Sequence, residues 1–337
     1  MIGAALLAAI AAGTVAGAHV LSGARWPWRT PRTAIALWQA LGLAWGIATI
    51  GTLLSVALLP YGDGIAGGLH RLTEDSGTRL GVPQLVALLS ALGIAAVLVA
   101  MLLFAVFRVV RARRRHRALL ALVAHGEPDG TLVLDHPAAA AYCVPGVRSA
   151  KVVVSAGTLR LLDQAELAAV LDHERAHARE RHDLVLLPFS SLRQIFPRFG
   201  LVGRSLDAVE LLIEMAADDR ARRHRPPREL ATALLRFAAA RPAAAPSGAL
   251  AAIGARDAQA SRPPAPGGSE PAGPVAAGAG SAAGRTFSPD ATAASPVLAR
   301  VSRLVEPAPS GPVTQVAVLA AASLLAVIPP LLYALPR

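Results

Sequence analysis

Histidines and carboxylates crowd together at one place in this chain, the segment LDHERAHARERHD at 171–183. The segment contains the pattern His-Glu-x-x-His, formed by His173, Glu174 and His177. On a helix, residues four apart share a face, so the two imidazoles could hold one metal ion with Glu174 beside it. A carboxylate in that position can take a proton from a metal-activated water and pass it to a leaving amine. The spacing therefore predicts hydrolytic metal chemistry.

An ordinary charged helix facing water is the alternative, because Glu and Arg also alternate here at helical spacings. The register of the apolar residues argues against it. The apolar residues between 167 and 171 mark one face of the helix, and His173, Glu174 and His177 continue that face. Polar groups turned toward a core are costly unless something satisfies them. The intervening arginines lie largely on the other side, as a solvated face requires.

A metal ion held by two histidines needs a third protein ligand. A carboxylate-rich helix that could supply it is predicted at 205–224. Glu214 is the favoured ligand because it lies in the apolar stretch LLIEMAA, where a charge on the surface would be hard to explain. Asp218, one turn later, can orient a histidine by accepting its second N–H. Glu210 shares the face of Glu214 and is the alternative ligand. Asp219 is expected to point to solvent and to pair with nearby arginines.

The motif helix must be positioned by a compact domain, which we expect at 111–240. Its first element is predicted to be a helix that continues from the basic cluster and ends near 124. Within it, the runs TLVLD, AAYCV and KVVVSAG between 131 and 157 predict short strands, since β-branched residues alternate and Pro and Gly punctuate them. Asp163 is predicted to cap the start of the motif helix. Cys143 is the only cysteine, so no intrachain disulfide forms. We interpret it as a packing residue rather than a nucleophile.

Composition places this domain on a membrane. Hydrophobic residues make up 54% of the 337 residues and charged residues only 16%, which is not typical of a soluble protein. Uncharged apolar tracts lie at about 2–21, 33–60, 82–107 and 313–335, each near or above the roughly 20 residues of a spanning helix. A cleaved signal peptide is the alternative for the first tract, but no Lys or Arg precedes Arg25. We predict a mostly α membrane protein with four transmembrane helices and an α+β domain between the third and fourth.

The arginines set the predicted orientation. The segment RVVRARRRHR at 108–117 holds six arginines, and cytoplasmic segments next to spans are enriched in Lys and Arg. This places the α+β domain in the cytoplasm and both termini outside, in a multi-pass protein of the cell membrane. Six of the residues behind the net charge of +11 lie in this cluster. We therefore expect contact with the lipid bilayer and no direct nucleic-acid binding.

Three further segments complete the organisation. Residues 241–296 are rich in Ala, Pro, Gly and Ser without apolar periodicity, which predicts a flexible linker. A short amphipathic helix is predicted at 296–306. The apolar segment 184–203 is interrupted by Pro and Gly, so we expect an interfacial or re-entrant element over the site. A full crossing there would separate Glu214 from His173. The predicted units are a membrane unit at 1–110, the domain at 111–240, the linker at 241–296, and the last helix and span at 297–337.

The stretches VVVSAGTLRLLDQAELAAVLDHERAHARERHDL and EMAADDRA, with three predicted spans before them and one after, resemble the integral-membrane zinc metallopeptidases of the M56 family. These are the BlaR1/MecR1-like proteins, which are related to the M48 peptidases typified by the HtpX and Ste24 proteases. The resemblance implies a zincin-like (gluzincin) HExxH fold with one Zn²⁺. In it, His173, His177 and Glu214 hold the zinc, Glu174 is the general base, and Asp218 supports a ligand.

The resemblance also implies how substrate binds. In related peptidases a strand edge beside the motif helix takes the substrate in extended form, and here that strand would be about Lys151 to Ser155. The residues expected to pair with a peptide by strand addition are Val152, Val153 and Val154. Arg220 is the candidate suggested as oxyanion stabiliser.

The resemblance finally suggests a function, an endopeptidase that cuts a protein or peptide at the cytoplasmic membrane face. The expected substrate is a winged-helix repressor of the BlaI type. The best-known family members carry an extracellular sensor domain after the last helix, whereas this sequence ends at Arg337, so a β-lactam sensor is not expected. Two alternatives stay open. One is a housekeeping protease for membrane proteins, as in the M48 relatives, and the other is a non-enzymatic membrane adaptor with a structural metal or none.

Overall fold

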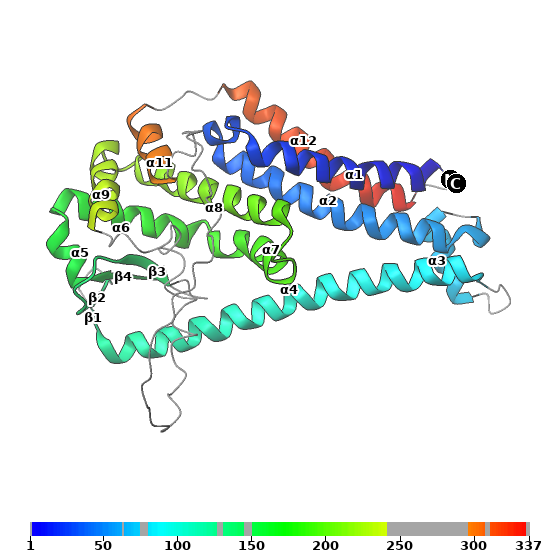
Figure 1. Cartoon of the computed structure of the whole chain (residues 1–337), viewed down its shortest axis with the longest axis horizontal. Coiled ribbons are helices and arrows are strands. Elements are labelled where there is room, and N and C mark those ends of the chain that lie inside the picture. Colours follow the sequence, from blue (N-terminus) through cyan, green and yellow to red (C-terminus); the bar gives the residue numbers. More distant parts are fainter. Residues whose placement is uncertain are drawn as a thin grey trace, which may run out of the picture.

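The computed structural model describes residues 2–62, 64–74, 80–126, 131–144, 150–240, 296–306 and 311–334. The molecule is elongated, with long helices at one end and a smaller mixed domain at the other (Figure 1). The helix α1 begins, and α12 ends, at the far end of the bundle from that domain. The predicted linker at 241–296 lies outside the described residues except for its last one.

Four helices among the described residues are long and apolar enough to cross a membrane. They are α1 (Ile2–Gly23), α2 (Pro31–Ala57), α4 (Val82–Val123) and α12 (Pro312–Ala334). They coincide with the four predicted tracts and support a multi-pass membrane protein. The helix α2 packs against the other three. Its crossing with α12 is close, because the ring of Tyr333 lies where a Cβ on Gly51 would be, and the Tyr333 hydroxyl donates to the carbonyl of Ile47 at 2.6 Å.

The helix α4 carries the chain from the bundle into the domain. Its 42 residues correspond to about 63 Å, of which the uncharged tract accounts for about 39 Å. The arginine cluster lies in the remaining part, which ends at Val123, close to the predicted end near 124. Between α2 and α4 the described residues contain the short helix α3 (Gly64–Glu74).

A four-stranded sheet lies at the end of α4, in the order β1-β2-β4-β3 (Figure 1). The strands are β1 (Ala124–Gly126), β2 (Leu132–Leu134), β3 (Ala141–Val144) and β4 (Lys151–Ser155). The strand β4 pairs with β2 in parallel and with β3 antiparallel, so both of its edges are occupied. The prediction that Val152, Val153 and Val154 offer a free edge to substrate is therefore wrong. These valines are buried, and β3 is the outer strand on the side of the motif helix.

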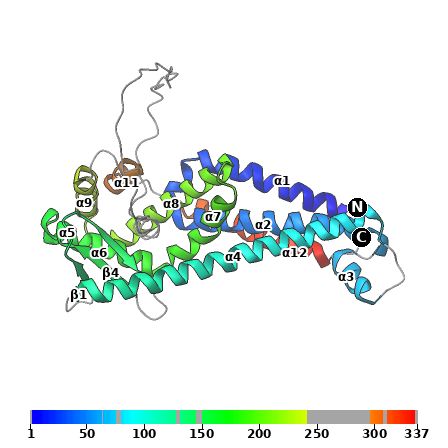
Figure 2. The same cartoon turned by 60° about the horizontal axis from the view of Figure 1, so that its bottom comes forward.

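Among the described residues, six helices complete the domain. They are α5 (Ala156–Leu161), α6 (Gln164–Arg179), α7 (His182–Ile195), α8 (Gly200–Ala221), α9 (Pro227–Ala240) and α11 (Pro296–Val305). The motif helix α6 begins where the sequence predicts, with a reciprocal cap. Asp163 accepts from the Glu166 N–H at 2.9 Å, and Glu166 accepts from the Asp163 N–H at 3.0 Å. In both views α9 and α11 lie together at the end of the domain away from the sheet's outer strand β1 (Figure 2).

The segment 184–203 forms most of α7 and the start of α8, and it is not among the four candidate spans. The helix α7 packs against α8, α4 and α2. Phe189 meets the edge of Trp38 at 6.3 Å between ring centroids, and the Gln39 amide donates to the Val185 carbonyl at 2.8 Å. The chain therefore returns from α6 to α8 on one side of the bundle, which allows the two helices to share a site.

Candidate metal centre

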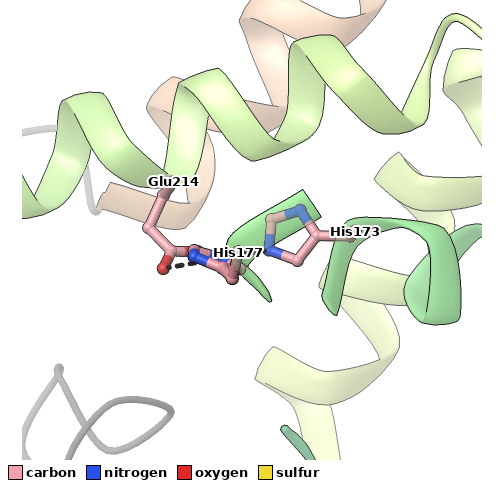
Figure 3. A group of neighbouring side chains, drawn as sticks. All are labelled: His173, His177 and Glu214. Atoms are coloured by element: carbon pink, nitrogen blue, oxygen red, sulfur yellow. Dashed lines mark hydrogen bonds and ion pairs between the residues drawn. The ribbon is translucent and has the colours of Figure 1, made fainter. Parts of the chain in front are cut away.

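His173 and His177 from α6 and Glu214 from α8 point toward one another (Figure 3). The two histidine Nε2 atoms are 3.1 Å apart, and each lies 3.5 Å from one of the Glu214 carboxylate oxygens. A tetrahedral zinc ion with bonds of about 2.0–2.1 Å separates its ligand atoms by about 3.3 Å. The donor types and the spacing of the group therefore fit a zinc ion.

The pKa values of the two imidazoles shift in opposite directions. Burial alone would lower the pKa of His173, but the carboxylates of Asp218 and Glu214 raise it to about 9. Burial lowers the pKa of His177 to about 3, and the nearby charge of Glu214 only partly opposes this. Burial also disfavours the charge on Glu214, but Arg300 holds the pKa of that carboxyl well below its usual range. Without a metal, the His173 imidazole is thus the one that carries a proton at neutral pH.

Behind His173 lies a buried charge pair. The Asp218 Oδ1 is 3.0 Å from the His173 Nδ1, a short contact that is not aligned as a hydrogen bond. Arg300 of α11 donates to both Asp218 oxygens, at 2.7 and 2.8 Å, and its Nη1 lies 2.7 Å from the Glu214 Oε2. Burial would raise the pKa of Asp218, but Arg300 lowers it to about 2. Asp218 lies where the sequence predicts a supporting carboxylate, and Arg300 fixes it there.

Sequence reasoning missed Arg300. The signal was its place in the amphipathic helix at 296–306, where Arg300 lies on the same face as the packed residues Val297 and Leu304. Arg220, the guessed oxyanion stabiliser, does not line the pocket beside Glu174, whereas Arg300 does. The cation nearest the proposed chemistry therefore comes from beyond the predicted linker.

On the other side, His177 is held by a chain of contacts that reaches α2, one of the candidate membrane spans. The His177 Nδ1 lies 2.9 Å from the His182 Nδ1, and the His182 Nε2 lies 3.4 Å from the Glu180 Oε2. Glu180 accepts two hydrogen bonds from Arg32 of α2, at 2.6 and 3.0 Å. Arg32 also donates to the carbonyl of Ala216, in α8, at 2.9 Å. Arg32 thus ties the C-terminal cap of α6 to α8 close to Glu214, a role that the sequence alone did not indicate.

Glu174 lies between the ligand group and the sheet. Burial raises the pKa of its carboxyl to about 7, and the carboxylate accepts a hydrogen bond from the backbone N–H of Cys143 in β3. Beside it is a small, mostly apolar pocket. The pocket is lined by Ala141, Val170, His173, Glu174, Leu230, Leu234, Phe237 and Arg300. Burial also raises the pKa of the Cys143 thiol to about 12, in keeping with a packing residue.

Two predictions about neighbouring carboxylates are corrected. Glu210, the alternative ligand, lies one turn before Glu214 and is not part of the ligand group. Asp219 does pair with arginines, with Arg303 at 2.7 Å and Arg222 at 3.4 Å. It does not point to solvent, since its side chain is only 14% exposed. Arg303 lies on α11 and brings a second cation against α8, so Asp219 is covered.

Residues 110–217 match the family model described as peptidase family M48. The matched range runs from the end of α4 through Glu214 and so includes all three residues of the ligand group. Comparisons with curated proteins and with solved structures found no match. The family match supports a zinc metallopeptidase family, and with the four candidate spans it supports a metallopeptidase of the membrane type. It does not support the M56 assignment suggested by the sequence.

Proposed function

We propose that this protein is a membrane-bound zinc endopeptidase whose zinc is held by His173, His177 and Glu214. The observation that carries the proposal is the convergence of two imidazole nitrogens and a carboxylate at separations of 3.1 to 3.5 Å, with Glu174 beside them. The match to peptidase family M48 over the same residues supports it. When bound, zinc would acidify a water molecule and polarise the peptide carbonyl.

Glu174 is proposed as the general base. In the zinc-free protein, burial raises the pKa of this carboxyl toward neutral pH, the range in which a general base can take up and return a proton. The hydrogen bond from the Cys143 N–H orients the carboxylate and ties it to the sheet. Arg300 is a positioning residue, because its guanidinium holds Asp218 and one oxygen of Glu214.

The substrate is proposed to add to β3 rather than to β4. The Ser155 N–H donates to the Ala140 carbonyl at 2.9 Å, which fixes the register between the two strands. Because the direction of backbone groups alternates along an antiparallel strand, Ala141 and Cys143 turn theirs outward. The Cys143 N–H already reaches Glu174, so this edge faces the site. An extended peptide paired with Ala141 would lie across the pocket beside Glu174.

Two biological roles are proposed as alternatives. The arginine cluster of α4 favours a domain in the cytoplasm, and regulatory cleavage there of a winged-helix repressor is the expectation from the M56 resemblance. Housekeeping cleavage of membrane proteins is the second candidate, and the match to the M48 model rather than M56 favours it. A non-enzymatic adaptor would not need Glu174 beside the three ligands.

The test uses the full-length chain purified in detergent. It should bind about one zinc per chain and cleave an unfolded protein substrate such as casein, and a chelator should stop cleavage. Glu174→Gln should keep the zinc and lose cleavage by at least 100-fold, the scale of general-base catalysis. Glu210→Gln, a carboxylate of the neighbouring helix outside the ligand group, should keep both. Cleavage that persists in Glu174→Gln or in excess chelator would contradict the proposal.

A further inference from the structure

The hairpin between α7 and α8 exposes large apolar side chains. We call residues 193–200 the hairpin tip. Phe196 and Phe199 are 49% and 57% exposed, and Ile195 beside them is also exposed. Arg193 and Arg198 of the tip are exposed as well. Adjacent exposed aromatic and aliphatic side chains flanked by arginines are unusual on a surface that faces only water.

Contacts place the hairpin beside the ends of two candidate spans, α1 and α4. The Arg108 Nη1 donates to the Gln194 Oε1 at 2.8 Å, and Arg108 is the first charged residue after the apolar tract of α4. On the opposite side of the hairpin, an Arg204 Nη2 lies 3.3 Å from the Nδ1 of His19, within α1 and four residues before its end. The tip therefore lies at the level where α1 and α4 change from apolar to charged.

The body of α7 lies alongside α2, deeper in the bundle. Phe189 packs on Trp38, and the Val185 carbonyl accepts from Gln39. A helix rises about 1.5 Å per residue, so Trp38 is about 10 Å along α2 from its first residue. Phe104 and Phe107 of α4, four residues and one residue before Arg108, are exposed too. The apolar surface of the tip thus continues the apolar surface that α4 presents at the end of its span.

We propose that the hairpin tip is embedded in the bilayer, at the boundary between headgroups and acyl chains on the side of the metallopeptidase domain. Phe196 and Phe199 would enter the acyl region, while Arg193 and Arg198 would reach lipid phosphates. The continuity with the exposed phenylalanines of α4 favours lipid as the occupant. The inference is independent of catalysis, and it sets the metal centre close to the membrane surface, because α7 begins at His182, in contact with His177.

The experiment compares three label positions of similar exposure in the full-length chain, reconstituted in phosphatidylcholine and phosphatidylglycerol vesicles. In a Cys143→Ala background, Phe199→Cys is labelled with a small fluorophore. Phe107→Cys, 61% exposed at the end of the α4 tract, is the control in lipid, and Leu122→Cys, 81% exposed, is the control in water. Leu122 lies about 22 Å further along the same helix. Quenching is measured with spin-labelled acyl chains and with iodide in the aqueous phase.

The label at Phe199→Cys should behave like that at Phe107→Cys. Acyl-chain quenchers should act on it at least threefold more strongly than on Leu122→Cys, and iodide correspondingly less. A label quenched by iodide as at Leu122→Cys would overturn the proposal. Protection from both quenchers would also overturn it, since a second copy or another protein would then cover the tip. Ile195→Cys provides an independent position, and helical content and melting temperature show that each variant is folded.

Discussion

The two histidines of the ligand group are supported in opposite ways. The His173 side is a closed set of charges inside the domain, where Asp218 is 1% and Arg300 5% exposed. The His177 side runs through His182 and Glu180 to Arg32, whose side chain is 36% exposed. Breaking a buried ion pair leaves an uncompensated charge and costs about 3–5 kcal/mol, whereas an exposed pair contributes about 0.2–1 kcal/mol. The comparison teaches that contacts within the domain hold His173, while the contacts that hold His177 extend to α2, a candidate membrane span.

Removing the cation of the buried side should have the largest effect. In the zinc-free protein, Arg300→Met leaves the carboxylates of Asp218 and Glu214 with the protonated His173 as their cation, so one buried negative charge is uncompensated. This should cost about 3–5 kcal/mol of stability. We expect the melting temperature in detergent to fall by roughly 10 °C. Arg228→Met, an exposed arginine of the adjacent helix α9, is the matched control and should not change it. An unchanged melting temperature in Arg300→Met would mean that the buried side is not held by charge.

Removing the carboxylate of the buried side should act mainly on the metal. Asp218→Asn removes the carboxylate charge that lies 3.0 Å from the His173 Nδ1, and loss of such a supporting partner lowers metal affinity about 10- to 100-fold. Asp219→Asn is the matched control, because this neighbouring carboxylate pairs with Arg303 instead. Zinc affinity is measured by competition with a chelator of known affinity. Equal losses in the two variants would contradict the specific role of Asp218.

The opposite pKa directions of the two imidazoles predict how zinc binding depends on pH. His173, with a pKa of about 9, must lose its proton before it can bind zinc, whereas His177, with a pKa of about 3, is already neutral. Zinc affinity should therefore rise with pH, about tenfold per unit between pH 6 and 8, with roughly one proton released per zinc at pH 7. Calorimetry in buffers of different ionisation enthalpy measures that proton. Affinity that stays constant over this pH range would show that His173 is neutral before zinc binds.

Removing Arg32, at the end of the contacts that support His177, should have the smallest effect on zinc affinity. Arg32→Gln removes the bridge from α2 to Glu180 and to the Ala216 carbonyl, and a partly exposed pair of this kind corresponds to a loss of about two- to fivefold in zinc affinity. Arg29→Gln, an exposed arginine three residues earlier, is the matched control and should leave affinity unchanged. A loss of zinc affinity above tenfold in Arg32→Gln would show that His177 depends on its support as strongly as His173 does.

Local patterns in the sequence predicted the parts of the site that neighbouring residues determine. The apolar register placed His173, Glu174 and His177 on the inner face of α6, and the Asp163 cap marked where that helix begins. Glu214 could be chosen because a charge inside an apolar run needs a partner. The strand assignment failed at the next level. A valine run such as Val152–Val154 indicates burial, but not which neighbours cover its two edges.

The sequence by itself determined the four candidate membrane-spanning helices, the motif helix and the three residues offered as ligands. Each follows from residue periodicity or from a run of apolar side chains within a single element. Only the tertiary structure decided what supports those ligands and which strand faces the substrate. Arg300 lies 82 residues from Asp218, and Arg32 lies 148 residues from Glu180. Such pairs depend on how helices pack around the site. No local sequence pattern indicates which distant arginine will pair with two buried carboxylates.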